Sequence, residues 1–287
     1  MSASASISES DLRELIIQLG PWHQKVQVTE SVSTAVSLEA PKALYSAHGP
    51  VAFIDDHDEF AGLMGALFPD GLAGKTLIEA ACNCGAYSLW FRQMGGRGAF
   101  GFDARNHWIR QAEFLKSHLL SADDDSVQFA VADLYAVPSL NREPADVGMF
   151  KGIFYHLPDP IGGLRIVADL TRELLIFNTS TRSSFKPGLV LSQESVTNVM
   201  SGIHGLNWFP SGPNVAQAIL KSMGFNDFRV LFWHKRPSLR FGSARGLKIY
   251  VKNMIMGTGR MELLAARTPG FFDAFDSSGF HRAYRWT

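Results

Sequence analysis

Residues 75–103 place the tightest constraint on how this chain can fold. They read KTLIEAACNCGAYSLWFRQMGGRGAFGFD, in which one short apolar run ends in Glu79 and a second ends in Asp103. Small residues around Gly85 and then a helical pattern lie between the two runs. The segment therefore predicts a strand, a tight turn, a helix and a second strand. In a parallel α/β sheet, both acids would lie at the carboxyl edge, where such sheets bind nucleotide-like ligands.

The turn and the two acids favour a ligand that contains a ribose. Small residues let the backbone pass close to a ligand, and Gly85 tolerates unusual dihedral angles. Asp103 follows Glu79 at close to the roughly 20-residue spacing at which an acid meets a ribose hydroxyl in nucleotide-binding βαβ units. Only Gly85 remains where dinucleotide-binding folds carry G-x-G-x-x-G, so a ribose without a pyrophosphate fits better.

This segment resembles motifs I and II of the class I S-adenosylmethionine (SAM) dependent methyltransferases. It is most similar to the branch with D-x-G-C-N-x-G-x-Y-S in motif I, which contains the tRNA wobble-uridine carboxymethyl- and methoxyuridine-type enzymes. The resemblance implies that the ribose binds to Asp103 and that the turn and its flanks contact the rest of the cofactor. Those residues are Glu79, Ala81, Cys82, Asn83, Gly85, Tyr87 and Ala104. Ala81 departs from the motif, which usually has glycine there, and we expect SAM binding to survive its added methyl group.

The resemblance also covers the ends of the third and fourth expected strands. Asp133 and Leu134 would bind the adenine; the alternative is that Asp133 caps a helix or lies in a solvated loop. Phe150, Lys151 and Gly152 end the fourth strand and begin a loop similar to G-x-x-Y-H-x-x-D-P. These three residues would lie near the amino acid end and the sulfonium of SAM.

The same loop and two later segments provide candidates for the methyl acceptor. Tyr155 and His156 would lie at the mouth of the transfer pocket, and His156 has the chemistry of a general base because an unperturbed histidine titrates near neutrality. Alternatively, His156 only shapes the loop. Asn178, after the fifth strand, could orient a polar substrate, and Trp208 could wall its pocket.

Composition limits which class of methyl acceptor and which cell compartment we expect. The chain has 287 residues, a formal net charge of zero and only two cysteines, Cys82 and Cys84. It lacks the basic stripe of a strong nucleic-acid binder, so a nucleic-acid partner is not expected. Two cysteines cannot close a zinc site or a disulfide framework, so we expect no metal and a reducing compartment. Without a signal peptide or a membrane span, a soluble cytoplasmic protein is expected.

We therefore expect SAM as the cofactor and transfer of its methyl group to an oxygen or nitrogen of a small polar or glycan-like metabolite. A tRNA-modifying methyltransferase is the runner-up. A third hypothesis is a non-catalytic SAM-binding module whose turn is altered by Ala81.

Alternating apolar runs and helical patterns predict a doubly wound, mostly parallel α/β sheet of seven strands. The expected strands are 76–80, 99–103, 127–131, 146–150, 173–178, 227–233 and 260–267, the last two forming an antiparallel hairpin as the resemblance implies. Residues 1–52 are expected to form a helical and extended appendage, with 26–38 extended. Residues 53–267 form the SAM-binding domain, with an insertion at about 234–256. The aromatic tail 268–287 is expected to dock onto the body or onto a second copy, which leaves a homodimer open.

Overall fold

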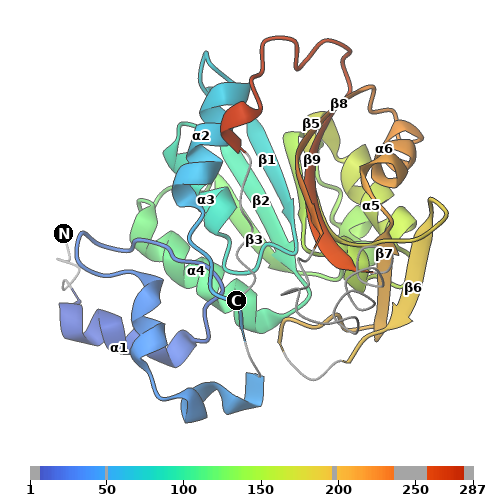
Figure 1. Cartoon of the computed structure of the whole chain (residues 1–287). Coiled ribbons are helices and arrows are strands. Elements are labelled where there is room, and N and C mark those ends of the chain that lie inside the picture. Colours follow the sequence, from blue (N-terminus) through green and yellow to red (C-terminus); the bar gives the residue numbers. More distant parts are fainter. Residues whose placement is uncertain (1–6, 49–50, 196–198, 236–256, 281–287) are drawn as a thin grey trace.

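A seven-stranded sheet with helices on both faces forms the body of the protein (Figure 1). The computed structural model describes residues 7–48, 51–195, 199–235 and 257–280. The strand order is β3-β2-β1-β4-β5-β9-β8. The strands are β1 (Thr76–Ala80), β2 (Gly98–Asp103), β3 (Val127–Val131), β4 (Ala145–Lys151), β5 (Thr171–Arg182), β8 (Asp227–Lys235) and β9 (Thr258–Ala266).

The pairing confirms the expected topology. Strands β1 to β5 of this sheet pair in parallel, and β9 pairs antiparallel with both β5 and β8. The final hairpin is thus antiparallel, as predicted. Strands β2 and β4 lie on opposite sides of β1, so the strand order reverses there. Such a reversal leaves a crevice at the carboxyl edge of the sheet.

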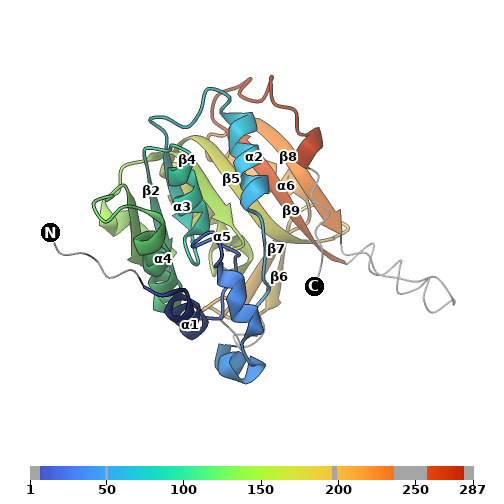
Figure 2. The ribbon, with the colours of Figure 1, turned by 90° about the vertical axis from the view of Figure 1, so that its left-hand side faces the viewer.

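The two faces of the sheet bury alternate residues of each strand. On β5, Leu174 and Ile176 face the core covered by α2 (His57–Leu67), α3 (Ala86–Gln93) and α4 (Asn106–Leu119). Leu175 and Phe177 face the core covered by α5 (Pro160–Asp169) and α6 (Pro213–Lys221). Figure 1 shows these two groups of helices on opposite sides of the strands, and Figure 2 looks onto the face that α2, α3 and α4 cover. This three-layer packing holds the strand ends in place and so fixes the site.

The N-terminal segment is helical at first, as expected, and then irregular. Helix α1 (Glu9–Leu19) buries Leu12 and Ile16. The expectation that 26–38 is extended is wrong from Thr34 onward, because η1 (Thr34–Glu39) is a 3₁₀ helix. The Ser33 hydroxyl accepts from the Ala35 N–H and caps this turn, and the buried Thr34 hydroxyl donates to the Gln24 carbonyl at 2.6 Å. A second 3₁₀ helix, η2 (Lys42–His48), follows.

A second, two-stranded sheet was not predicted. Strands β6 (Leu189–Gln193) and β7 (Leu206–Pro210) pair antiparallel in the connection between β5 and α6. In Figure 1 this hairpin and the N-terminal segment both lie at the end of the sheet toward which β1 points. Both additions therefore border the crevice at the carboxyl edge.

The described part of the aromatic tail docks onto the body. Phe272 is buried, its N–H donates to the Asp227 carboxylate at 3.1 Å, and its carbonyl accepts from Arg229 at 3.2 Å. Residues 236–256, most of the expected insertion, and residues 281–287 of the tail lie outside the described residues. Among the helices that the structure describes, none has the length and apolar character needed to cross a membrane.

Candidate active site

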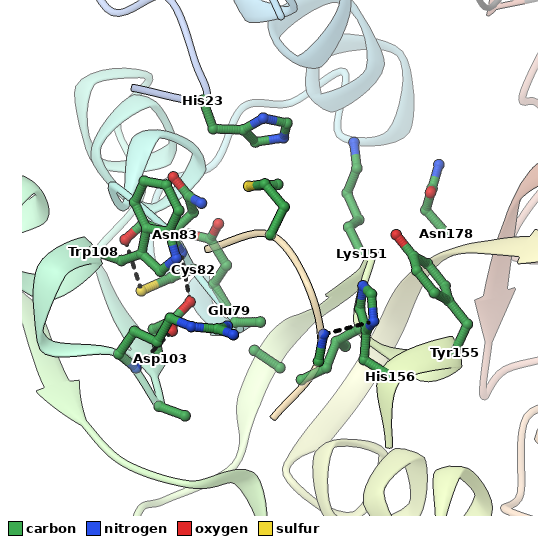
Figure 3. A pocket seen from close by; sticks show the side chains of 18 of the residues that line it. His23, Glu79, Cys82, Asn83, Asp103, Trp108, Lys151, Tyr155, His156 and Asn178 are labelled. Atoms are coloured by element: carbon green, nitrogen blue, oxygen red, sulfur yellow. Dashed lines mark hydrogen bonds between the residues drawn. The ribbon is translucent and has the colours of Figure 1, made fainter. Parts of the chain in front are cut away.

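A cavity of about 500 Å³ lies at the carboxyl edge of the large sheet. Its walls come from the ends of β1, β2 and β4, from β5 and β9, from residues 23–24 and 52–56 of the N-terminal segment, and from residues 199–204 between β6 and β7. Figure 3 shows Asp103 and Trp108 on one side of this cavity and Tyr155, His156 and Asn178 on the other. The cavity thus joins the predicted nucleoside side to the predicted acceptor side.

The turn after β1 has an unusual backbone. Ala81, Asn83 and Gly85 all have positive φ, at 53°, 52° and 70°. A Cβ atom on Gly85 would come within 2.4 Å of the Phe129 ring, so glycine is required there by space as well as by backbone conformation. Ala81 lies in the left-handed region, where glycine costs less than alanine. The conformation gives a physical reason for the glycine that the motif usually carries at this point.

Asp103 ends β2 and lines the cavity. Its Oδ2 accepts from the Asn83 N–H at 3.2 Å, and its Oδ1 accepts from the Arg105 N–H at 2.9 Å. Burial raises the pKa of this carboxyl to about 6, against these hydrogen bonds, which lower it. The ionised carboxylate has further lone pairs for hydroxyl donors from a ligand.

Glu79 is buried near the end of β1, and its side chain accepts hydrogen bonds from helix α3. Its Oε2 accepts from the Ser88 N–H at 3.0 Å and from the Ser88 hydroxyl at 2.6 Å. Burial raises the pKa of Glu79 to about 8, against the Ser88 hydrogen bonds and the Lys151 charge, which lower it. At neutral pH this side chain is therefore mostly protonated.

Asp133 has the capping role that was left open as an alternative, and it also lines the cavity. Its Oδ1 accepts from the Tyr135 N–H at 2.9 Å at the start of η3 (Leu134–Leu140). Leu134, Ala104 and the buried Trp108 line the same part of the wall. An apolar surface bordered by a carboxylate suits a purine ring with an amino group.

A chain of polar contacts crosses the opposite wall. Asn178 donates to Glu262 at 2.7 Å and accepts from Arg260 at 2.7 Å, and Lys151 lies 3.3 Å from Glu262. Arg260 also reaches the Tyr155 hydroxyl at 3.4 Å. Sequence reasoning selected Lys151, Tyr155 and Asn178 but missed the two residues on β9. Glu262 had a signal, since it is a lone acid inside an apolar strand.

His156 lies at the end of the short helix η4 (Phe154–His156) and lines the cavity. Its Nδ1 is 2.7 Å from Oε1 of Glu194 and 3.1 Å from the Gly202 nitrogen. Both side chains are mostly buried, with 17 % and 10 % of their surfaces exposed. Glu194 was not selected from the sequence, where nothing in LSQES distinguishes it.

The N-terminal segment adds His23 and Gln24 to the wall, and neither residue was predicted. His23 Nδ1 bonds to the Ala52 carbonyl, and burial lowers the pKa of the ring, which favours its neutral form. Gln24 accepts from the Cys84 thiol at 3.4 Å and so ties this segment to the turn after β1. No pattern in the sequence predicts that residues 23–24 lie beside residue 84.

Three predicted site residues lie apart from the described cavity wall. Gly85 supports the turn, and Phe150 is fully buried in the core on the face of the sheet that α5 and α6 cover. Trp208 lies on β7, while its neighbour Phe209 stacks on Tyr155 with the ring centroids 6.2 Å apart. The other predicted site residues, from Glu79 to Asn178, line the wall.

No known protein-family model matches this chain. Among solved structures, the N-terminal domain of EvdMO1 with S-adenosylhomocysteine (SAH) bound superposes with a TM-score of 0.64, over 92% of this chain and 99% of that domain. The chain has the Rossmann-like methyltransferase fold. The two sequences are only 16% identical, so this likeness concerns the fold. Full-length EvdMO1 superposes with a TM-score of 0.57, and this chain spans 49% of it.

One curated enzyme shows a partial sequence match. A stretch of 100 residues is 29% identical to the tRNA U34 carboxymethyltransferase of Helicobacter hepaticus. The match covers 34% of this chain and 31% of that enzyme, so it spans about a third of the relative's length. The methyltransferase fold and this match agree with the family resemblance of the motifs.

Proposed function

We propose that this protein is a SAM-dependent methyltransferase that acts on a small polar acceptor. The observation that carries the proposal is that one cavity has Asp103 on one side and His156 with Asn178 on the other (Figure 3). A methyl transfer needs a donor and an acceptor side by side, and this cavity offers chemically different walls for each. Its volume of about 500 Å³ falls within the range of roughly 300–1,000 Å³ that suits small ligands.

The residues of the nucleoside side fit SAM. The buried Asp103 carboxylate, held by two backbone N–H groups, would accept from the ribose hydroxyls. Asp133 and Leu134 would bind the adenine, and the turn around Ala81 and Asn83 would pass close to the amino acid end. When bound, SAM supplies an electrophilic methyl group on its sulfonium.

The acceptor side has polar groups that can orient the acceptor, and His156 is its candidate base. Asn178 and Arg260 present amide and guanidinium groups that hold each other in place at 2.7 Å, and such paired groups orient a polar substrate with little loss of side-chain entropy. Lys151, Gly152 and Tyr155 would lie where the two substrates meet. Alignment of an acceptor atom with the methyl carbon would supply most of the acceleration.

A tRNA-modifying enzyme is the second candidate, favoured by the match to the tRNA U34 carboxymethyltransferase. The neutral net charge argues against it, because a tRNA enzyme neutralises several phosphates with basic residues. A gel-shift titration with bulk tRNA separates the two candidates. Tight binding that weakens steeply with added salt favours the tRNA enzyme, and no binding at physiological salt favours the small acceptor.

Transfer of labelled methyl groups from SAM tests the proposed activity. The acceptors offered would be monosaccharides, small hydroxylated acids and tRNA, and D-fucose is a suitable first probe because the EvdMO1 domain was also crystallised in the presence of SAH and D-fucose. A labelled small-molecule product that is lost in His156→Ala and Asp103→Ala supports the proposal. SAM binding without transfer to any acceptor class would instead support a non-catalytic module.

A further inference from the structure

Glu194 and His156 form a buried pair that the sequence did not reveal. Oε1 of Glu194 lies 2.7 Å from Nδ1 of His156, although the two residues are on separate elements, the segment after β6 and the helix η4. Within the described part of the chain, the other Glu194 oxygen, Oε2, is buried and has no hydrogen-bond partner. A buried carboxylate with so few donors is stabilised chiefly by the ring beside it.

The contacts at Nδ1 determine where the ring carries its proton. A ring nitrogen has one in-plane position, so Nδ1 either donates to Glu194 at 2.7 Å or accepts from the Gly202 N–H at 3.1 Å. If Nδ1 carried a lone pair, that lone pair would face a carboxylate oxygen at 2.7 Å, which is repulsive. The proton therefore belongs on Nδ1, where its bond to a charged acceptor is the stronger one.

This tautomer leaves Nε2 of His156 unprotonated. The ring points into the cavity (Figure 3), and no described residue forms a hydrogen bond with Nε2. The carboxylate also stabilises the imidazolium that forms when Nε2 takes a proton. The other titratable groups that line the acceptor side of the cavity include Tyr155, Lys151, Arg260, Glu262, His204 and Asp133.

Residues 199–204, which lie between β6 and β7, pack against the pair at Gly202. A Cβ atom on Gly202 would lie 2.6 Å from Oε2 of Glu194 and 2.8 Å from Cβ of His156. Only glycine fits this close approach. Arg105, two residues after Asp103, donates a hydrogen bond to the Ser201 carbonyl in the same segment. Both sides of the cavity therefore contact the segment that packs against the pair.

We propose that Glu194 is a positioning residue that holds His156 as a general base, and that the methyl acceptor is accordingly a hydroxyl group. This inference rests on the proposed methyltransferase function. The acceptor oxygen forms a bond to the methyl carbon while the carbon–sulfur bond breaks. The electron pair of that bond goes to sulfur, which leaves as neutral SAH, and the hydroxyl proton goes to Nε2 of His156. A hydroxyl releases its proton reluctantly at neutral pH and gains most from such a base.

Nitrogen NMR of the histidine rings tests the pair without any acceptor. The full chain is labelled with ¹⁵N-histidine, and the signal of His156 among the nine histidines is assigned with His156→Gln. Titrations are recorded for the wild type, for Glu194→Gln and for Glu143→Gln, a matched change at an exposed glutamate. We expect the Nδ1–H tautomer in the wild type. The titration midpoint of His156 should fall by about one pH unit or more in Glu194→Gln, and it should not move in Glu143→Gln.

An Nε2–H tautomer in the wild type, or a midpoint that Glu194→Gln does not change, would overturn the pairing. Thermal unfolding and the unchanged signals of the other histidines verify that Glu194→Gln folds, and Glu194→Asp provides a second variant that keeps the charge. SAH calorimetry on the same samples separates the two claims. Absence of SAH binding refutes the proposed function, whereas the tautomer and midpoint report on Glu194 and His156 alone.

Discussion

The backbone N–H of Asn83 donates to Oδ2 of Asp103 across 3.2 Å. This bond ties the turn after β1 to the acid at the end of the neighbouring strand β2. Because Asn83 has a positive φ of 52°, its N–H is aimed by the same unusual turn that lets the backbone approach a ligand. The turn and the acid therefore form one unit, and a ligand that contacts the turn also meets the carboxylate.

The first prediction is that cofactor affinity depends on pH through Asp103. Burial raises the pKa of this carboxyl to about 6, so the fraction that is ionised falls as the pH is lowered from 7 to 5. The protonated acid accepts ribose hydrogen bonds less well than the carboxylate. The Kd for SAM measured by calorimetry should therefore rise over this range. In Asp103→Asn, binding should be weaker at pH 7 and nearly independent of pH.

The second prediction concerns stability and Glu79. Burial raises the pKa of Glu79 from 4.5 to about 8, so the folded chain holds a proton that the unfolded chain releases between these values. The contribution of this group to the free energy of unfolding therefore falls as pH rises through that window, by at most about 1.4 kcal/mol for each pH unit. Glu79→Gln should remove this slope, and its melting temperature relative to the wild type should increase from pH 5 to pH 8. The exposed Glu113→Gln should show no such trend.

The third prediction is that Ala81→Gly relieves backbone strain. At a φ of 53°, alanine costs about 1–2 kcal/mol more than glycine, and the greater freedom of glycine in the unfolded chain offsets roughly half of this. Denaturant unfolding should show a gain of up to about 1 kcal/mol, and SAM binding should be kept or tightened. Ala43→Gly, at an exposed residue without a positive φ, should instead lose stability. Loss of SAM binding by a folded Ala81→Gly would show that the motif is wrongly aligned on this turn.

The fourth prediction concerns catalysis by His156. If this residue is the general base, His156→Ala should lower kcat by roughly 10²- to 10⁴-fold without changing SAM affinity, and His156→Gln should be nearly as poor. The acidic limb of the pH–rate profile should disappear in both. Because Glu194 acts through the ring, the double variant His156→Gln with Glu194→Gln should be no slower than His156→Gln alone. Recovery of most of the rate by His156→Gln would show that this residue only shapes the loop.

The strands that form the site could be placed from the sequence because their apolar runs are short and end in polar residues. Strands β1 and β3 begin and end at the expected residues, and Asp103 ends β2 as predicted. Strand β5 runs on to Arg182, beyond the expected end at residue 178, because its polar residues pair with β9 rather than entering a loop. Asn178 pairs with Lys151 across the sheet and lines the cavity.

The parts of the site that depend on contacts far apart in the chain could not be predicted. Strand β6 is only partly buried and its apolar run is just three residues long, 189–191, so the hairpin that places Glu194 has a weak local signal. His23 reaches the cavity only because the N-terminal segment packs over the sheet edge, where Lys25 and Ile54 share a backbone hydrogen bond of 2.8 Å. Residue types and spacing identify a strand end, whereas the positions of Glu194 and His23 at the cavity arise from tertiary packing.

Calorimetric titration of SAH into the wild type and into Asp103→Ala tests the central claim most directly, with the exposed Asp123→Ala as the matched control. The wild type should bind one SAH per chain. Loss of the Asp103 carboxylate should cost about 1.5–3 kcal/mol of binding, the usual worth of hydrogen bonds to a charged group, which is roughly a 10- to 150-fold increase in Kd. Asp123→Ala should bind like the wild type. An absence of SAH binding by the folded wild type, or an unchanged Kd in a folded Asp103→Ala, would contradict the account.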